Sequence, residues 1–159
     1  MGDLTTLAAE LGATLKARGL MLTLAESCTG GLASVAITEI PGSSAWFDRG
    51  FVTYSNAAKI EMLGVSAKTL ETYGAVSEET AREMVSGALK NSHAQIACSI
   101  TGVAGPGGGT PEKPVGMVCF AWAYAGKIIS KTKKISGNRQ HIRHLSAETA
   151  LRELLKILT

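Results

Sequence analysis

The sequence predicts an α/β domain with a mixed sheet, and three observations predict it. Apolar segments of strand length alternate with amphipathic segments of helical length along the 159 residues, which is typical of strands joined by crossover helices. One pair of strand-like segments is separated only by Ala125-Gly126, and a two-residue connection joins only antiparallel strands. No repeat, linker or change in composition divides the chain, so we expect a single domain over residues 1–159.

In the first half of the chain, glycine and proline mark where the expected helices end. Apolar residues recur at helical spacing from Leu4 onward, and Gly19 follows the helix as a terminating residue. Pro41-Gly42 stops the second helix. The expected elements are a helix over 4–18, a strand over 20–25, a helix over 32–40, a strand over 50–54, and short helices over 55–63 and 66–73.

The second half contains the hairpin and the longest helix. Ser77-Glu-Glu-Thr80 begins a helix with acidic residues in its first turn, where they are favourable beside the positive end of the helix dipole. Beyond it the apolar pattern changes to that of strands and then returns to helical spacing. The expected elements are a helix from 77 to about 91, a buried strand over 95–100, hairpin strands over 115–124 and 127–135, and a helix over 141–158.

Composition excludes several classes of protein. Hydrophobic residues make up 45% of the chain and charged residues 18%, as in ordinary globular proteins. The formal charge of +3 is small, and no basic stripe with interleaved aromatic residues favours nucleic acid. No apolar run reaches the ~20 residues of a membrane span. Cys28, Cys98 and Cys119 form no CxxC pair, so we expect a cytoplasmic protein with reduced thiols and neither nucleic acid nor membrane as a partner.

The most informative stretch lies between residues 20 and 32, where a strand-like segment meets the start of a helix. Glu26-Ser-Cys-Thr29 is followed there by Gly30 and Gly31. In open α/β sheets, ligands bind beyond the carboxyl ends of strands, where free N–H groups at helix N-termini face them. This stretch therefore predicts a site. The alternative is that Ser27 or Thr29 only caps the helix, which is a frequent role of both residue types.

A second glycine-rich stretch, Thr101–Thr110, directly follows the strand expected to end at Ile100. Glycine loses much backbone entropy on folding, so this many glycines in one loop favour a function for it. One interpretation is an anion-binding loop, because successive N–H groups can surround a phosphate. A flexible surface loop is the other. Two glycine-bearing loops after two strands favour a ligand that carries a phosphate.

Ser27 is a candidate nucleophile, and it needs a base. The candidates are His93, His141 and His144, or a lysine. Lys59 is the strongest of them, because it follows the second strand at the edge of the sheet where Ser27 follows the first. Burial among apolar neighbours would shift its pKa toward neutrality. The two histidines of the last helix lack nearby acidic ligands, so no metal site is expected.

Several short motifs follow one another along the chain: Ala25-Glu-Ser-Cys-Thr-Gly-Gly31, Gly42-Ser-Ser-Ala-Trp-Phe47, Gly50-Phe-Val-Thr-Tyr-Ser-Asn56, Gly74-Ala-Val-Ser77, Gly102-Val-Ala-Gly-Pro-Gly107 and Lys113-Pro-Val-Gly116. Together they resemble the CinA C-terminal domain family over roughly residues 5 to 157, and in particular its stand-alone members, which are nicotinamide mononucleotide deamidases. The resemblance implies a three-layer α/β/α fold with a mixed, mostly parallel sheet, often in a homodimer. It also implies that the pyrophosphatase-type activity of the larger N-terminal domain of full CinA proteins is absent.

The resemblance implies a reaction as well: hydrolysis of the carboxamide of nicotinamide mononucleotide to nicotinic acid mononucleotide and ammonia, without a cofactor. Ser27 is then the nucleophile, Lys59 its base, and Tyr54 a residue that assists proton transfer or orientation. Thr101 would hold the ligand or the oxyanion, and Arg139 or, as a close second choice, Arg143 would meet the phosphate. The remaining implied substrate-binding residues, the first three through backbone N–H groups, are Thr29, Gly30, Gly31, Gly102 and Gly105.

The alternative function is a non-catalytic nucleotide-binding or regulatory module of the same family. Such a module would be expected to lack at least one of Ser27, Tyr54, Lys59 and Thr101, and all four are present. The expected partner is a small-molecule substrate, and the expected assembly is a dimer. Release of ammonia from nicotinamide mononucleotide distinguishes the enzyme from the module.

Overall fold

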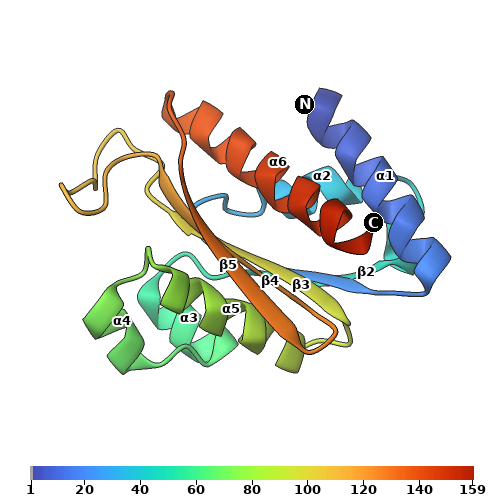
Figure 1. The fold of residues 1–159 in the computed structure, drawn as a ribbon, viewed down its shortest axis with the longest axis horizontal. Helices are drawn as coiled ribbons and strands as arrows, with labels where there is room; N and C mark the ends of the chain where they lie inside the picture. Colours follow the sequence, from blue (N-terminus) through green and yellow to red (C-terminus); the bar gives the residue numbers. More distant parts are fainter. Residues whose placement is uncertain (1) are drawn as a thin grey trace.

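The computed structural model describes residues 2–159. The elements in chain order are α1 (Gly2–Arg18), β1 (Leu22–Glu26), α2 (Leu32–Thr38), the 3₁₀ turn η1 (Ser43–Ala45), β2 (Phe47–Val52), α3 (Asn56–Leu63), α4 (Ala67–Tyr73), α5 (Glu78–Lys90), β3 (Ile96–Gly102), β4 (Met117–Tyr124), β5 (Lys127–Lys134) and α6 (Arg139–Leu158). Helices α1, α2 and α6 cover one face of the sheet, and α3, α4 and α5 cover the other (Figure 1). The three-layer α/β/α arrangement is confirmed.

The sheet is mixed, as the hairpin predicted. Within residues 2–159 it has five strands in the order β2-β1-β3-β4-β5. Strand β1 pairs in parallel with both β2 and β3, whereas β4 pairs antiparallel with β3 and β5. The carboxyl ends of β1, β2 and β3 therefore meet at one edge of the sheet.

Most predicted elements are confirmed to within a few residues, and two differ in a way that matters for the site. Strand β2 begins at Phe47, earlier than the expected start at residue 50. Because β2 is an edge strand, Asp48 and Arg49 can face water, and its apolar pattern is weak. Helix α6 begins at Arg139 rather than at residue 141, since the Asn138 side chain accepts a hydrogen bond from His141 N at 2.8 Å and caps the helix.

The largest apolar cluster lies between the sheet and α1, α2 and α6, and smaller clusters lie under α5 on the opposite face. One close contact places the helix that carries Lys59. A Cβ at Gly87 of α5 would lie 1.9 Å from the carbonyl oxygen of Leu63, the last residue of α3. Only glycine permits this approach, so α5 fixes the position of α3 beneath the sheet.

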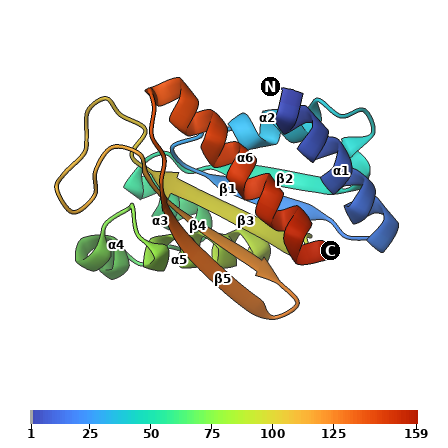
Figure 2. The same cartoon turned by 45° about the horizontal axis from the view of Figure 1, so that its top comes forward.

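The glycine-rich connection between β3 and β4 and the N-terminal end of α6 lie at the same end of the molecule in both views (Figure 2). Over residues 2–159, no helix is both long and apolar enough to cross a membrane. All three cysteines are buried and carry free thiols.

Candidate active site

A cavity of about 230 Å³ lies beyond the carboxyl ends of β1 and β3. The chain leaves β1 toward α2 on one face of the sheet and leaves the adjacent β2 toward α3 on the other face. Such divergence of neighbouring connections is where open α/β sheets form their binding crevices. The cavity is lined by Ser27, Cys28, Tyr54, Asn56, Lys59, Ala75, Val76, Thr101, Gly102, Ala104 and Arg139.

Ser27 is the first residue after β1. Its backbone N–H donates to the carbonyl of Ile100 on β3 at 2.9 Å, so the register of the two parallel strands fixes where the residue stands. Its side chain lines the cavity although the residue is only 6% exposed. The hydroxyl is therefore accessible to a bound ligand and largely protected from bulk water.

Lys59 reaches Ser27 from the other side of the sheet. It lies in the first turn of α3, which Ser55 caps by accepting a hydrogen bond from Ala58 N at 3.0 Å. Its Nζ lies 3.1 Å from Ser27 Oγ, 3.0 Å from the carbonyl oxygen of Thr53 and 3.4 Å from that of Tyr54. The sequence separates serine and lysine by 32 residues, and the fold brings them into hydrogen-bond contact.

The environment of Lys59 favours its neutral form. The residue is 1% exposed, and among the residues that the structure describes no carboxylate forms an ion pair with it. Burial is the main cause that lowers its pKa. A neutral amine has two N–H bonds and one lone pair. As an ammonium, Lys59 donates to Ser27 Oγ and to the carbonyls of Thr53 and Tyr54. Once it has lost one proton, its two N–H bonds can stay on the carbonyls, which leaves the lone pair for the Ser27 hydroxyl, as a general base requires.

Cys28 is the neighbouring alternative to Ser27 as a nucleophile. Burial is the main cause that raises the pKa of its thiol to about 12, with the negative charge of Glu26 acting in the same direction. The thiolate is the reactive form of cysteine. Cys28 therefore stays protonated near neutral pH and is an unfavourable nucleophile, although its side chain also lines the cavity.

Glu26 caps helix α2, a role that the sequence suggested for Ser27 or Thr29. The residue is fully buried. One carboxylate oxygen accepts from Thr29 Oγ1 at 2.6 Å and Ala33 N at 2.9 Å, and the other accepts from Ser34 N at 2.9 Å and Ser34 Oγ at 2.7 Å. The N–H groups that this architecture usually offers to a bound anion are thus occupied by the protein's own carboxylate.

This cap leads to a prediction about stability. Glu26→Gln replaces one carboxylate oxygen with an NH₂ group that faces two donors, so we expect the free energy of unfolding to fall by about 2–3 kcal/mol. Urea unfolding measures the difference. Glu39→Gln, at the exposed C-terminal end of the same helix, is the matched control and should be near neutral. Equal stability of the two variants would contradict the capping role.

Tyr54 and Arg139 form the outer part of the cavity. Tyr54 is 60% exposed, and its hydroxyl accepts a hydrogen bond from Arg139 Nη2 at 3.0 Å. Arg139 Nη1 donates to the carbonyl of Gly105 at 2.7 Å, and the guanidinium retains further N–H donors for an anion. The Tyr54 hydroxyl therefore contacts the arginine that the sequence favoured for the phosphate, an arrangement that supports orientation rather than proton transfer.

Thr101 and Gly102 form the inner wall at the end of β3. The Thr101 hydroxyl donates to the carbonyl of Ala75 at 2.8 Å. Its single proton is thereby engaged, so the group can accept from a ligand but cannot donate to an oxyanion in this arrangement. A Cβ at Gly102 would lie 2.9 Å from the carbonyl oxygen of Met117. Gly105 contributes its carbonyl to Arg139.

Five of the predicted binding residues do not line the cavity in the described part of the chain: Thr29, Gly30, Gly31, Gly105 and Arg143. Arg143 Nε and Nη2 donate to the carbonyls of Cys28 and Thr29 at 3.1 and 3.0 Å. Gly30 N donates to the Ser27 carbonyl at 3.0 Å. These groups shape the loop that carries Ser27, so the structure brings Arg139 rather than Arg143 to the cavity.

The structure adds a wall that sequence reasoning did not assign. Ala75 and Val76, from the connection between α4 and α5, line the cavity together with Asn56 and Ala104. The motif Gly74-Ala-Val-Ser77 was the available signal, but nothing in its composition indicates contact with a site far away in the sequence. Across residues 2–159 no three His, Cys, Asp or Glu side chains are grouped to hold a metal, and no histidine lines this cavity.

The fold and the cavity define a single-domain α/β protein with a buried serine–lysine pair. The chain belongs to the CinA C-terminal domain family, whose model matches residues 4–158. It is 56% identical over 155 residues to the nicotinamide-nucleotide amidohydrolase PncC of Enterobacter agglomerans, covering 94% of each chain. It is 52% identical over 153 residues to the protein of the same name from Escherichia coli K12, covering 96% of this chain and 93% of that one.

Solved structures agree with this assignment. The competence/damage inducible protein CihA from Agrobacterium tumefaciens superposes with a TM-score of 0.98 at 47% identity, covering 100% of this chain and 98% of that one. A CinA superfamily protein from Klebsiella pneumoniae superposes with a TM-score of 0.94 at 37% identity, with 98% and 97% covered. The CinA-like fold is therefore shown by sequence and by structure.

Proposed function

We propose that this protein is an amidohydrolase that converts nicotinamide mononucleotide to nicotinic acid mononucleotide and ammonia. The observation that carries the proposal is the 3.1 Å contact between Ser27 Oγ and Lys59 Nζ at the wall of a cavity. The names of relatives that match nearly the whole chain at 52–56% identity support the substrate.

The first half of the reaction forms an acyl-enzyme. Neutral Lys59 takes the proton of the Ser27 hydroxyl, and Oγ attacks the carboxamide carbon. The lysine is then an ammonium beside the negative charge that develops on the attacked carbonyl, which it stabilises in a water-poor site. Lys59 next gives its proton to the departing amide nitrogen. Ammonia leaves, and the nicotinoyl group remains as an ester on Ser27.

The second half repeats the proton transfers with water. Lys59, neutral again, takes a proton from water as the water attacks the ester carbon. It returns this proton to Ser27 Oγ as the ester bond breaks, and the carboxylic acid is released. One water is consumed and one amide bond is cleaved, so neither a redox step nor a cofactor is needed.

The buried serine–lysine pair and the exposed arginine suit the two ends of the mononucleotide. Ser27 and Lys59 are buried, whereas Arg139 is exposed. We infer that the carboxamide enters toward the serine, that the phosphate meets Arg139, and that the ribose lies between them. The N-terminal N–H groups of α2 do not take part, because Glu26 occupies them.

One assay tests this function directly. Ammonia release is measured with the purified full chain and nicotinamide mononucleotide, nicotinamide or glutamine as substrate. We expect release from the mononucleotide and far slower release from the other two, which lack the phosphate. Tight binding of the mononucleotide without ammonia release would instead support a non-catalytic nucleotide-binding module.

The phosphate contact gives a prediction about the two arginines. Arg139→Met should raise KM for the mononucleotide by roughly 10–100-fold, the value of one or two charge-assisted hydrogen bonds, with a smaller effect on kcat. Arg143→Met removes bonds to the loop carbonyls of Cys28 and Thr29, so it should lower kcat or stability more than it raises KM. Steady-state kinetics separate the two. The reverse pattern would reassign the phosphate to Arg143.

Metal removal should leave the activity unchanged. Prolonged dialysis against a chelator followed by the ammonia assay checks this, and loss of activity that added zinc restores would overturn the serine–lysine mechanism. A homodimer and a cytoplasmic location remain expectations of this proposal. The first comes from the family resemblance, and the second comes from the unpaired thiols.

A further inference from the structure

The connection between α4 and α5, residues 74–77, is held in place by side chains from three different elements. Three consecutive carbonyls accept hydrogen bonds here, beginning with that of Tyr73 at the end of α4. That of Tyr73 accepts from Lys113 Nζ of the β3–β4 connection. That of Gly74 accepts from Ser77 Oγ and Thr80 Oγ1 at 2.9 and 2.7 Å, and that of Ala75 accepts from Thr101 Oγ1 at 2.8 Å. A loop fixed in this way is a rigid wall.

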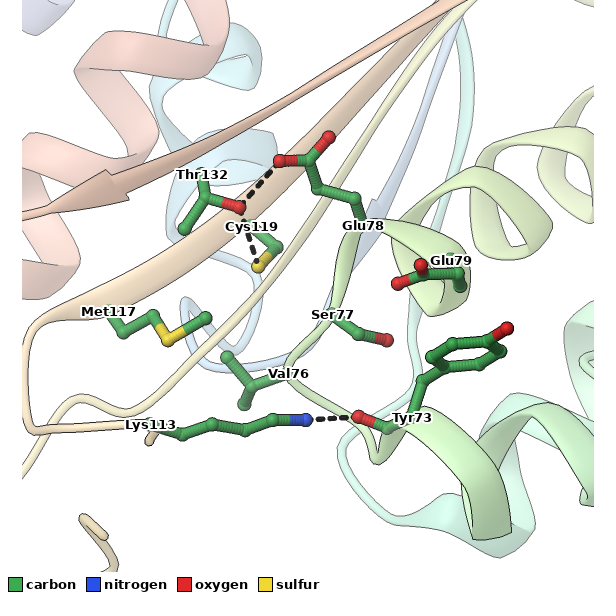
Figure 3. Close-up of a pocket in the computed structure, with 9 residues that line it drawn as sticks. All are labelled: Tyr73, Val76, Ser77, Glu78, Glu79, Lys113, Met117, Cys119 and Thr132. Carbon is green, nitrogen blue, oxygen red and sulfur yellow. Dashed lines mark hydrogen bonds between the residues drawn. The ribbon is translucent and has the colours of Figure 1, made fainter. Parts of the chain in front are cut away.

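A second, larger cavity of about 480 Å³ lies on the face of the sheet that carries α4 and α5 (Figure 3). Most of its polar groups already bond within the protein. Glu78 accepts from Ser130 Oγ and Thr132 Oγ1 at 2.8 and 2.7 Å, and Lys113 donates to the carbonyl of Tyr73. These bonds leave few unpaired polar groups that could bind a ligand in the larger cavity. We therefore describe this cavity as space beside the active site.

Val76 lines both cavities. Figure 3 shows it among the residues that line the larger one, between Met117 and Ser77. The smaller cavity holds Ser27 and Lys59, and the opposite, outer end of that cavity carries the exposed Tyr54 and Arg139. In the substrate orientation proposed above, the phosphate end is therefore unconfined, whereas the ring beside the carboxamide faces the fixed wall.

We propose that Val76 is a specificity-determining residue that limits the size of the aromatic ring bearing the carboxamide, by closing the active site against the larger cavity. This inference rests on the proposed function. Loss of the two γ-methyl groups in Val76→Ala removes atoms from the wall between the two spaces. A ring extended by a second fused ring then gains room, while the pyridine ring itself loses only modest packing.

The test compares nicotinamide mononucleotide with two ring-extended analogues, the mononucleotides of quinoline-3-carboxamide and isoquinoline-4-carboxamide. Their fused rings project from different edges of the pyridine. For Val76→Ala we expect the kcat/KM of at least one analogue relative to nicotinamide mononucleotide to rise ~10-fold over the wild-type ratio, the scale of discrimination by one or two methyl groups in an apolar pocket. The same ratio is measured as binding affinity by calorimetry, which requires no turnover.

Val85→Ala is the matched control, because Val85 is fully buried on α5 and lines neither cavity. Val85→Ala should lower the free energy of unfolding at least as much as Val76→Ala does. It should leave the ratio of analogue to nicotinamide mononucleotide at the wild-type value. Unchanged ratios for both analogues in Val76→Ala, in kinetics and in binding, overturn the inference, and so does an equal change in the control. A wild-type protein that releases no ammonia overturns the proposed function alone, since the affinity ratio still decides the role of Val76.

Discussion

Ser27→Ala is expected to lower kcat for ammonia release by at least about a thousandfold, since removal of a covalent nucleophile typically costs several orders of magnitude. The fold should survive, because the change removes one hydroxyl and Lys59 keeps its bonds to the carbonyls of Thr53 and Tyr54. The affinity for the mononucleotide should stay within a few-fold of wild type. Single-turnover kinetics and calorimetry on the same preparation measure the two quantities.

Cys28→Ala is the control for this prediction, because Cys28 is the next residue and lines the same cavity. With its pKa raised to about 12 by burial, the thiol is not expected to attack the amide, so the variant should retain most of the activity. Near-full activity of Ser27→Ala together with loss of activity in Cys28→Ala would assign the nucleophile to cysteine.

Lys59→Arg and Lys59→Met are expected to be almost equally inactive, each losing roughly 10²–10⁴-fold in kcat, the usual contribution of a general base. Arginine keeps the positive charge but does not deprotonate in a protein. Because the lysine is 1% exposed, the larger guanidinium is strained there, and methionine serves as the apolar variant of similar size. Substantial activity in Lys59→Arg would show that the charge, and not proton transfer, is what the site needs.

The pH dependence of the wild type checks the same role without a substitution. The base must be neutral, so kcat/KM should rise with pH through the pKa of Lys59, which burial lowers from its ordinary value. The rise is therefore expected below the ordinary range of lysine. A kcat/KM that does not change with pH between the lowered and the ordinary pKa of lysine would exclude Lys59 as the base.

Stability should follow the same titration with a defined sign. Since the folded-state pKa of Lys59 is lowered, the unfolded chain binds more protons in the window between the lowered and the ordinary value. The free energy of unfolding of the wild type should therefore rise with pH across that window. Lys59→Met lacks this titration, so the free energy of unfolding of the wild type should rise relative to that of the variant as pH rises. Urea unfolding at several pH values measures it.

Glycines and periodic apolar residues made most of the fold predictable. Gly19 and Gly64 end helices with φ of +66° and +69°, conformations that other residues rarely adopt, and the Ala125-Gly126 turn indicated the hairpin of β4 and β5. Local patterns of this kind depend on a few neighbouring residues. Edge strand β2 was placed less well, because its solvent-facing positions carry no apolar pattern.

The sequence by itself predicted the class of fold and the family, and both are confirmed. It also singled out Ser27 and Lys59 as candidates, because each follows a strand at one edge of the sheet. Only the tertiary structure placed Arg139 and not Arg143 at the cavity, gave the capping role to Glu26, and brought Ala75 and Val76 to the cavity. The physical reason is that these assignments depend on which residues the fold brings together and on which hydrogen-bond partners are still free after the chain has folded. The sequence alone does not distinguish a carboxylate or guanidinium that is hydrogen-bonded within the protein from one that is free to bind a substrate.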